Sequence, residues 1–80
     1  MQIRHRFTDA LIDRRKDIGM SRGKAAAAAG LDISALFRLE RGQREPTFAT
    51  VEKLALVLGF DVMVGRGGTI YTWEDTGDGS

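Results

Sequence analysis

Arginine side chains are the groups in this sequence whose type and placement suggest a defined chemistry. Four of the nine arginines lie in the middle of the chain, at Arg22, Arg38, Arg41 and Arg44. A guanidinium group is a planar, permanently charged fork that binds carboxylates and phosphates through paired hydrogen bonds, and it can bond O6 and N7 of guanine in the same way. These residues therefore indicate recognition of an anion or of a base edge.

Groups that do covalent or metal chemistry are scarce. The chain has no Cys and one His, at His5, which excludes disulfides, thiolate catalysis and ordinary Cys/His zinc sites. No general base accompanies an evident nucleophile. The glycine-rich residues 65–68 lack the Lys and the helix of a phosphate-binding loop, so we interpret them as a turn. We predict a protein that is not an enzyme and binds no metal or cofactor.

Charge is unevenly distributed along a chain whose 80 residues suit a single domain. Residues 1–60 hold 11 basic and 7 acidic side chains, whereas residues 61–80 hold one basic and four acidic side chains. A basic body suggests a polyanionic partner, although a similar excess is common on solvated surfaces. Because the sequence has neither an apolar run of membrane-spanning length nor a secretory signal, we expect a cytoplasmic protein with no membrane partner.

Four segments of helical period, each followed by a glycine, predict a mostly α-helical fold. The segments span residues 9–18, 22–29, 33–41 and 48–58. The glycines that end them are Gly19, Gly30, Gly42 and Gly59. The residues expected to cap their N-termini are Thr8, Ser21, Asp32 and Thr47.

The last part of the chain has a pattern typical of β-strands. Residues 60–64 have the alternating period of a strand, with Phe60, Val62 and Val64 at every second position, and residues 69–73 are β-branched and aromatic. Gly67-Gly68 suits a two-residue hairpin turn. In that register, the facing pairs are Val64 with Tyr71 and Val62 with Trp73.

These patterns predict three parts of the chain. Residues 1–60 form the helical domain, residues 61–74 form a strand or hairpin, and residues 75–80 form a disordered acidic tail.

A bihelical unit lies at residues 22–41. Its two helices meet at a turn that contains Gly30, and Ala26 stands where the first helix would cross the second. Leu36 and Leu39 would hold the second helix against the body, which leaves its other face exposed. Such a helix is narrow enough to enter the major groove of DNA.

Several short motifs within residues 7–60 have a family resemblance. They are Gly19-Met-Ser21, Ala26, Gly30, Leu36, Leu39-Glu-Arg-Gly42, Pro46 and Leu54-Ala-Leu-Val-Leu-Gly59. Together, at this spacing, they resemble the Cro/phage-repressor family, also called the XRE family. The resemblance implies a lambda-repressor-like bundle of four short helices and a sequence-specific DNA-binding regulator of transcription, which we expect to be a repressor.

The resemblance also assigns roles to particular residues. It implies that residues 33–41 are the recognition helix, and that its base-contacting side chains are Ile33, Ser34, Phe37 and Arg38. Family members usually carry a polar residue at the position of Phe37. In this chain, Phe37 either touches a base or is partly covered by the body. Arg22 matches a phosphate-contacting position. We expect further backbone contacts from the remaining arginines of the basic surface, Arg41, Arg44, Arg4 and Arg6, the last two in a basic arm.

Arg15 and Glu40 match family positions that form an ion pair between the first and third helices. Because a charge on a buried stripe is normally paired, we interpret both as structural. Ala25 and Ala29 replace larger apolar residues of the family. The residues expected to fill the resulting space are Phe7, Phe48 or Phe60.

The C-terminal strand suggests a subtype, since many family members have a fifth helix there. A strand at this place is similar to HipB-type antitoxins, in which it pairs with its copy in a second subunit. A lone hairpin is marginally stable and its open edge accepts another strand. We therefore predict a homodimer with an interface of Val62, Val64, Tyr71 and Trp73; the alternative is a hairpin folded back on its own body.

A dimer would set two recognition helices about 34 Å apart, as successive major grooves of double-stranded DNA require. The sequence thus predicts a dimeric repressor that reads an inverted repeat. The alternative function is that of an antitoxin, which binds a toxin protein and autoregulates its operon.

Overall fold

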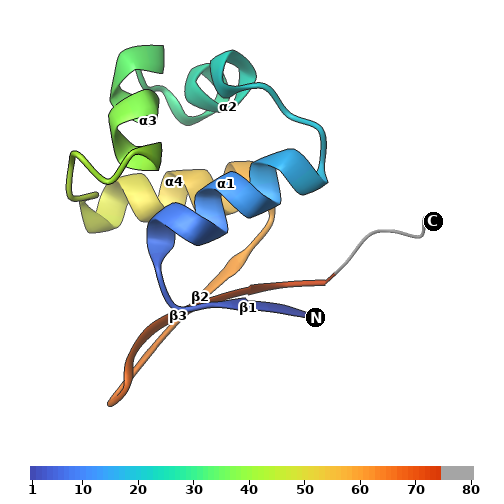
Figure 1. Cartoon of the computed structure of the whole chain (residues 1–80), viewed down its shortest axis with the longest axis vertical. Helices are drawn as coiled ribbons and strands as arrows, with labels where there is room; N and C mark the ends of the chain where they lie inside the picture. Colours follow the sequence, from blue (N-terminus) through green and yellow to red (C-terminus); the bar gives the residue numbers. More distant parts are fainter. Residues whose placement is uncertain (75–80) are drawn as a thin grey trace.

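The computed structural model describes residues 1–74 and arranges them in three layers (Figure 1). Helices α2 (Arg22–Ala29) and α3 (Ile33–Glu40) form the first layer, and helices α1 (Phe7–Asp17) and α4 (Phe48–Leu58) form the second. The third layer is an antiparallel sheet of β1 (Gln2–Arg4), β3 (Gly68–Trp73) and β2 (Asp61–Gly65), in that order. The prediction of a mostly α-helical bundle with a C-terminal hairpin is confirmed. The predicted acidic tail, 75–80, lies outside the described residues.

Local signals determine most helix ends. The four glycines predicted to end helices all have a φ near +70°, a left-handed conformation that glycine adopts without a Cβ clash. The Ser21 hydroxyl accepts a hydrogen bond from the Lys24 N–H at 3.1 Å, and the Thr47 hydroxyl accepts one from the Thr50 N–H at 3.2 Å. Both N-terminal caps are therefore as predicted. Asp32 stands at the N-cap of α3 but makes no side-chain capping bond.

The start of α1 differs from the prediction. The helix begins at Phe7, and Arg6 rather than Thr8 is the N-cap residue, with no side-chain capping bond. The Phe7 ring is buried, with its centroid 5.6 Å from that of Tyr71 and 6.3 Å from that of Phe60. Aromatic packing, rather than a hydroxyl cap, therefore holds the beginning of this helix.

The N-terminal segment is a strand and not the free basic arm that we expected. Gln2, Ile3 and Arg4 pair with Trp73, Thr72 and Tyr71 of β3. β1 therefore covers one edge of β3, and β2 covers the other. Residues 1–60 and 61–74 consequently share one sheet and one core.

The hairpin register is shifted by two residues from the predicted one. Gly65 pairs with Gly68, so the turn residues are Arg66 and Gly67, and Val62 faces Tyr71. Gly68 has a φ of +112°, which favours glycine at the start of β3. Because the side-chain period of a strand is two, the shift leaves the same side chains on each face of the sheet.

The hairpin folds back on its own body. Tyr71 and Trp73, predicted at the dimer interface, are buried in the chain's own core beside Phe60, at centroid distances of 5.9 and 6.4 Å. Val62 is half-buried against this core, and Val64 is exposed. Of the three phenylalanines expected to fill the space beside Ala25 and Ala29, Phe7 and Phe60 are buried against the sheet residue Tyr71, and Phe48 is exposed.

Candidate nucleic-acid interface

α3 presents one face to the core and the other to solvent. Leu36 and Leu39 are buried, which anchors the helix on α1 and α2. Ala26 is buried where α2 meets α3, and the Leu31 N–H donates to its carbonyl at 2.8 Å across the turn at Gly30. The small side chain and the left-handed glycine together allow the close approach of the two helices.

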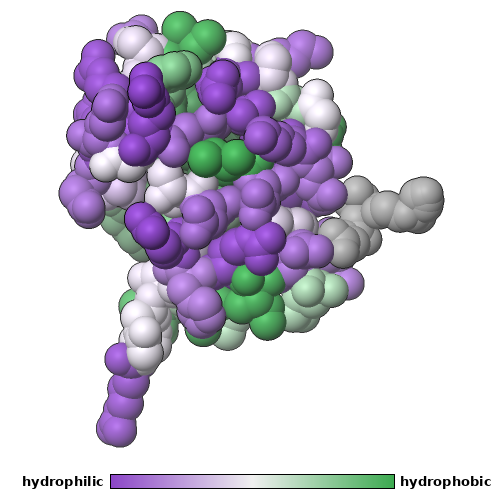
Figure 2. Space-filling model, viewed as in Figure 1, coloured by the Kyte–Doolittle hydropathy of each residue, from purple (hydrophilic) through white to green (hydrophobic). Residues whose placement is uncertain are grey.

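The predicted base-contacting residues share the exposed face of α3. Ile33 and Phe37, like Ser34 and Arg38, are four residues apart, a step that places side chains on one side of a helix. All four are exposed to solvent: Ile33, Ser34, Phe37 and Arg38. Within residues 1–74, Arg38 has no ion-pair or hydrogen-bond partner for its guanidinium group. Figure 2 shows that hydrophilic residues dominate the visible surface over the helices.

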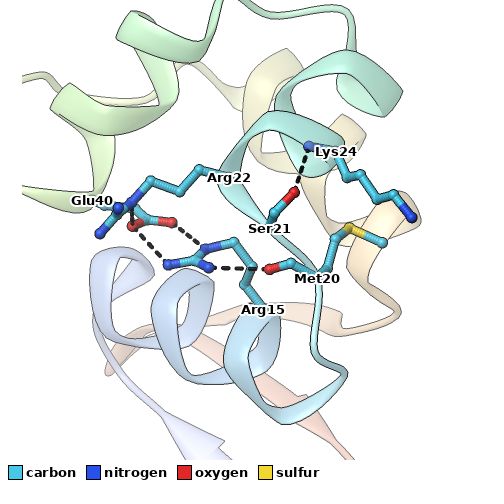
Figure 3. A network of polar contacts seen from close by, with 6 residues as sticks. All are labelled: Arg15, Met20, Ser21, Arg22, Lys24 and Glu40. Carbon is cyan, nitrogen blue, oxygen red and sulfur yellow. Dashed lines mark hydrogen bonds and ion pairs between the residues drawn. The ribbon is translucent and has the colours of Figure 1, made fainter.

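Glu40 joins three helices beneath this face (Figure 3). Its carboxylate accepts hydrogen bonds from Arg15 Nε at 2.6 Å and Arg15 Nη2 at 3.1 Å, and from Arg22 Nε at 2.8 Å. Arg15 Nη1 donates to the Met20 carbonyl at 3.1 Å. The ion pair expected between Arg15 and Glu40 is therefore present, and it extends to Arg22 at the start of α2.

The charge state of Glu40 follows from this geometry. Burial by itself raises the pKa of the carboxyl, but the hydrogen bonds and positive charges of Arg15 and Arg22 outweigh it, so that the pKa lies below its ordinary value. Glu40 is consequently a carboxylate throughout the neutral range and holds both guanidinium groups in place.

Phe37 lies beneath two guanidinium groups. The central carbon of Arg22 and that of Arg41 each stand 5.1 Å from its ring centroid. These are cation–π distances. The contacts bring together two predicted phosphate-contacting residues from different helices, which their separation in the sequence does not reveal.

The remaining predicted phosphate-contacting residues separate into two groups. Arg6 and Arg44 line one groove, between the start of α1 and the loop after α3, together with His5. Arg4 lies in β1, where its Nε donates to Asp13 Oδ2 at 2.7 Å. Its charge is therefore engaged within the chain, on the sheet side of the molecule.

Arg14 is a structural residue that the sequence analysis missed. Its buried side chain donates from Nε to the Leu58 carbonyl at 2.7 Å and from Nη1 to Asp17 Oδ2 at 3.0 Å. A cation at the C-terminal end of α4 donates to a carbonyl that has no partner within the helix, and it interacts favourably with the negative end of the helix dipole. The available signal was its spacing, because Arg14 follows Phe7 and Leu11 at the seven- and three-residue steps of the buried stripe.

Comparison with known protein families agrees with this geometry. The family model described as helix-turn-helix, HTH_3, matches residues 11–62, well over half of the chain. The chain belongs to the helix-turn-helix family. No curated protein and no solved structure gives a significant match.

The family assignment determines the general function of the helix-turn-helix protein. This family is of the XRE type, and its members are DNA-binding regulatory domains. It is not a family of enzymes. The matched region contains the unit of α2 and α3, together with α4 and the first residues of β2. None of the helices in residues 1–74 has the length and apolar character needed to cross a bilayer.

Proposed function

We propose that this protein is a sequence-specific repressor that binds an inverted-repeat operator as a homodimer, with α3 in the major groove. The observation that carries the proposal is the exposed outer face of α3, which is braced from behind by buried leucines and by the Glu40 network. A rigid helix with an open face meets the steric requirement for reading base edges.

Direct readout is the role of side chains along the middle of that face. The guanidinium of Arg38 has no partner among residues 1–74, and it can bond O6 and N7 of one guanine and contribute about 1–3 kcal/mol of discrimination. Ser34 can bond several base edges, and Ile33 can touch a thymine methyl group.

Phosphate binding is the role of the surrounding arginines. Arg22 begins α2, whose free N–H groups and dipole also favour an anion. Arg41, Arg44 and Arg6 stand around α3 on exposed parts of the chain. Such contacts position the protein without reading the sequence.

The homodimer is supported by the far side of the molecule. β2 is an edge strand, and the hairpin projects from the body, as Figures 1 and 2 show. Met63 and Val64 on this strand are exposed, Val64 by 74%. Pairing of two β2 edges would cover these side chains and leave α2 and α3, at the opposite layer, free for DNA.

Selection from a random pool of double-stranded DNA tests the DNA-binding proposal. We expect enrichment of a palindrome by the wild-type protein. The Arg38→Ala variant should lose preference at one position of each half-site, whereas Arg22→Ala should weaken binding to all sequences alike. Failure to enrich any palindrome would contradict the proposal, and a uniform loss in Arg38→Ala would remove its role as the reader.

Sedimentation of an edge variant tests the homodimer. A lysine on an edge strand opposes strand pairing, so Val64→Lys should have the mass of a monomer. Leu56→Lys is the matched control, because Leu56 is 85% exposed on α4, outside the sheet. A dimer that persists in Val64→Lys would refute pairing through β2.

A second candidate function is that of an antitoxin that binds a toxin protein. It is favoured by exposed apolar side chains of the sheet, Met63 and Val64 on β2 and Ile3 on β1, because a protein partner could cover them while DNA occupies α3. Co-purification with the protein encoded by an adjacent gene, lost in Val64→Lys and kept in Leu56→Lys, would support it. A wild-type chain that leaves that protein unbound would exclude it.

A further inference from the structure

Phe37 stands at an unusual point of the candidate interface. It is an aromatic residue on the exposed face of α3, with 40% of its surface open to solvent. Its ring is contacted by Arg22, the first residue of α2, and by Arg41, the C-cap residue of α3. An apolar side chain in this place therefore contacts charged groups as well as solvent.

The two guanidinium groups keep most of their donors available. Arg22 uses Nε to bond Glu40, and within residues 1–74 its Nη1 and Nη2 groups have no acceptor. The guanidinium of Arg41 likewise has no acceptor in this part of the chain. Both side chains are thus held by the ring while their N–H groups stay free to bind an anion.

The local charge also favours an anion. Arg15 and Arg22 share a single carboxylate, Glu40, and Arg41 adds a third positive charge over the Phe37 ring that Arg22 also contacts. Two long, flexible cations side by side repel each other and lose rotamer freedom when they bind a phosphate. A ring that attracts both of them in advance reduces that loss before the ligand arrives.

We propose that Phe37 is a positioning residue, which holds Arg22 and Arg41, the first and last residues of the helix-turn-helix unit in the sequence, side by side to bind backbone phosphates. This inference rests on the proposed DNA binding and gives Phe37 a different role from the base contact that the family resemblance implied. The role depends on the π face of the ring and not on its apolar volume, which makes the two roles separable.

Binding measurements on Phe37→Leu test the proposal. Leucine keeps an apolar side chain but has no π face, so affinity should fall about threefold to tenfold for operator and non-operator DNA alike. The slope of log affinity against log salt should become shallower. Phe37→Tyr, which retains the ring, should restore affinity. Phe48→Leu is the matched control, since Phe48 is an exposed aromatic residue of α4 with no guanidinium over its ring among the described residues.

A double-mutant cycle gives a second readout that a purely structural role would not change. Arg41→Gln should weaken DNA binding more in the wild-type background than in Phe37→Leu, because the ring no longer orders Arg41 in the latter. Circular dichroism and the urea midpoint should show that both single variants remain folded.

Each other outcome overturns the inference. A loss in Phe37→Leu confined to one base position would make Phe37 a reader, and an unchanged affinity would leave it no role in binding. Additive effects in the cycle would show that the ring does not position Arg41. A wild-type chain that binds no DNA would refute the proposed function itself, and this inference with it.

Discussion

Replacement of Glu40 by Gln should destabilise the fold strongly. The Glu40 side chain is 3% exposed and that of Arg15 is 9% exposed, so their ion pair is shielded from water. A glutamine has one acceptor oxygen. Placed at Oε1, that oxygen keeps the bonds from Arg15 Nη2 and Arg22 Nε, but its NH₂ group then faces Arg15 Nε across the 2.6 Å contact, donor against donor.

The magnitude follows from the loss of the shared negative charge. The variant loses one charge-assisted bond, weakens two others, and leaves a buried guanidinium without a counter-charge. We expect a loss of about 2–4 kcal/mol in the free energy of unfolding. A domain of this size has roughly 3–5 kcal/mol in total, so Glu40→Gln should be close to unfolding at room temperature. Its thermal midpoint should fall by roughly 10 °C or more.

Urea denaturation followed by Trp73 fluorescence measures the effect, because the only tryptophan of the chain is buried in the core. The matched control is Glu52→Gln, an exposed position on α4, which should change stability by less than about 0.5 kcal/mol. A Glu40→Gln variant as stable as this control would refute the account of the buried network.

The pH dependence of the same comparison has a definite sign. The pKa of Glu40 is below its ordinary value of 4.5 in the folded chain, so its ionisation stabilises the fold at pH values above 4.5. That stabilisation is lost as the pH falls from 4.5 through the folded-state pKa. The difference between wild type and Glu40→Gln should therefore be largest near neutral pH and shrink in acid. A difference that stays constant into acid would contradict the assignment.

Three further predictions concern other parts of the molecule. Gly59→Ala should destabilise the chain by about 1 kcal/mol in urea denaturation, because Gly59 has a φ of +76° and a Cβ there would meet Arg14 Nη2 at 3.4 Å. Gly67→Ala is the control and should be neutral, because Gly67 has open space around it and no positive φ. Arg14→Ala should cost about 1–3 kcal/mol by the same assay, since it removes a buried cation and leaves the Leu58 carbonyl unpaired; a neutral variant would exclude Arg14 as the cap of α4. Filter binding over a range of salt concentrations should give a log–log slope of about −5 to −7 for the dimer on its operator, and a slope near zero would rule out the phosphate contacts.

The bihelical unit could be predicted from the sequence because its signals act over a few residues. A glycine without a Cβ ends a helix wherever it follows one, and a hydroxyl three residues before a free N–H caps it, as at Ser21 and Thr47. The apolar period of residues 33–41 likewise identified the buried face of α3, and with it the exposed face. The pair of Arg15 and Glu40 required more, namely the family resemblance and the rule that buried charges are paired.

Tertiary structure decided the features that depend on residues far apart in the chain. The three residues of β1 carry no local signal that they pair with β3. Arg4 was therefore expected in a basic arm, whereas it lies in a strand. The burial of Tyr71 and Trp73 depends on Phe7 and Phe60 being brought beneath them. The contact of Arg22 with Phe37 arises only when α2 packs against α3, whereas that of Arg41, four residues after Phe37, is local. Sequence determined where helices begin and end, because those interactions are short-range; packing determined which charges and rings meet, because those interactions span the fold.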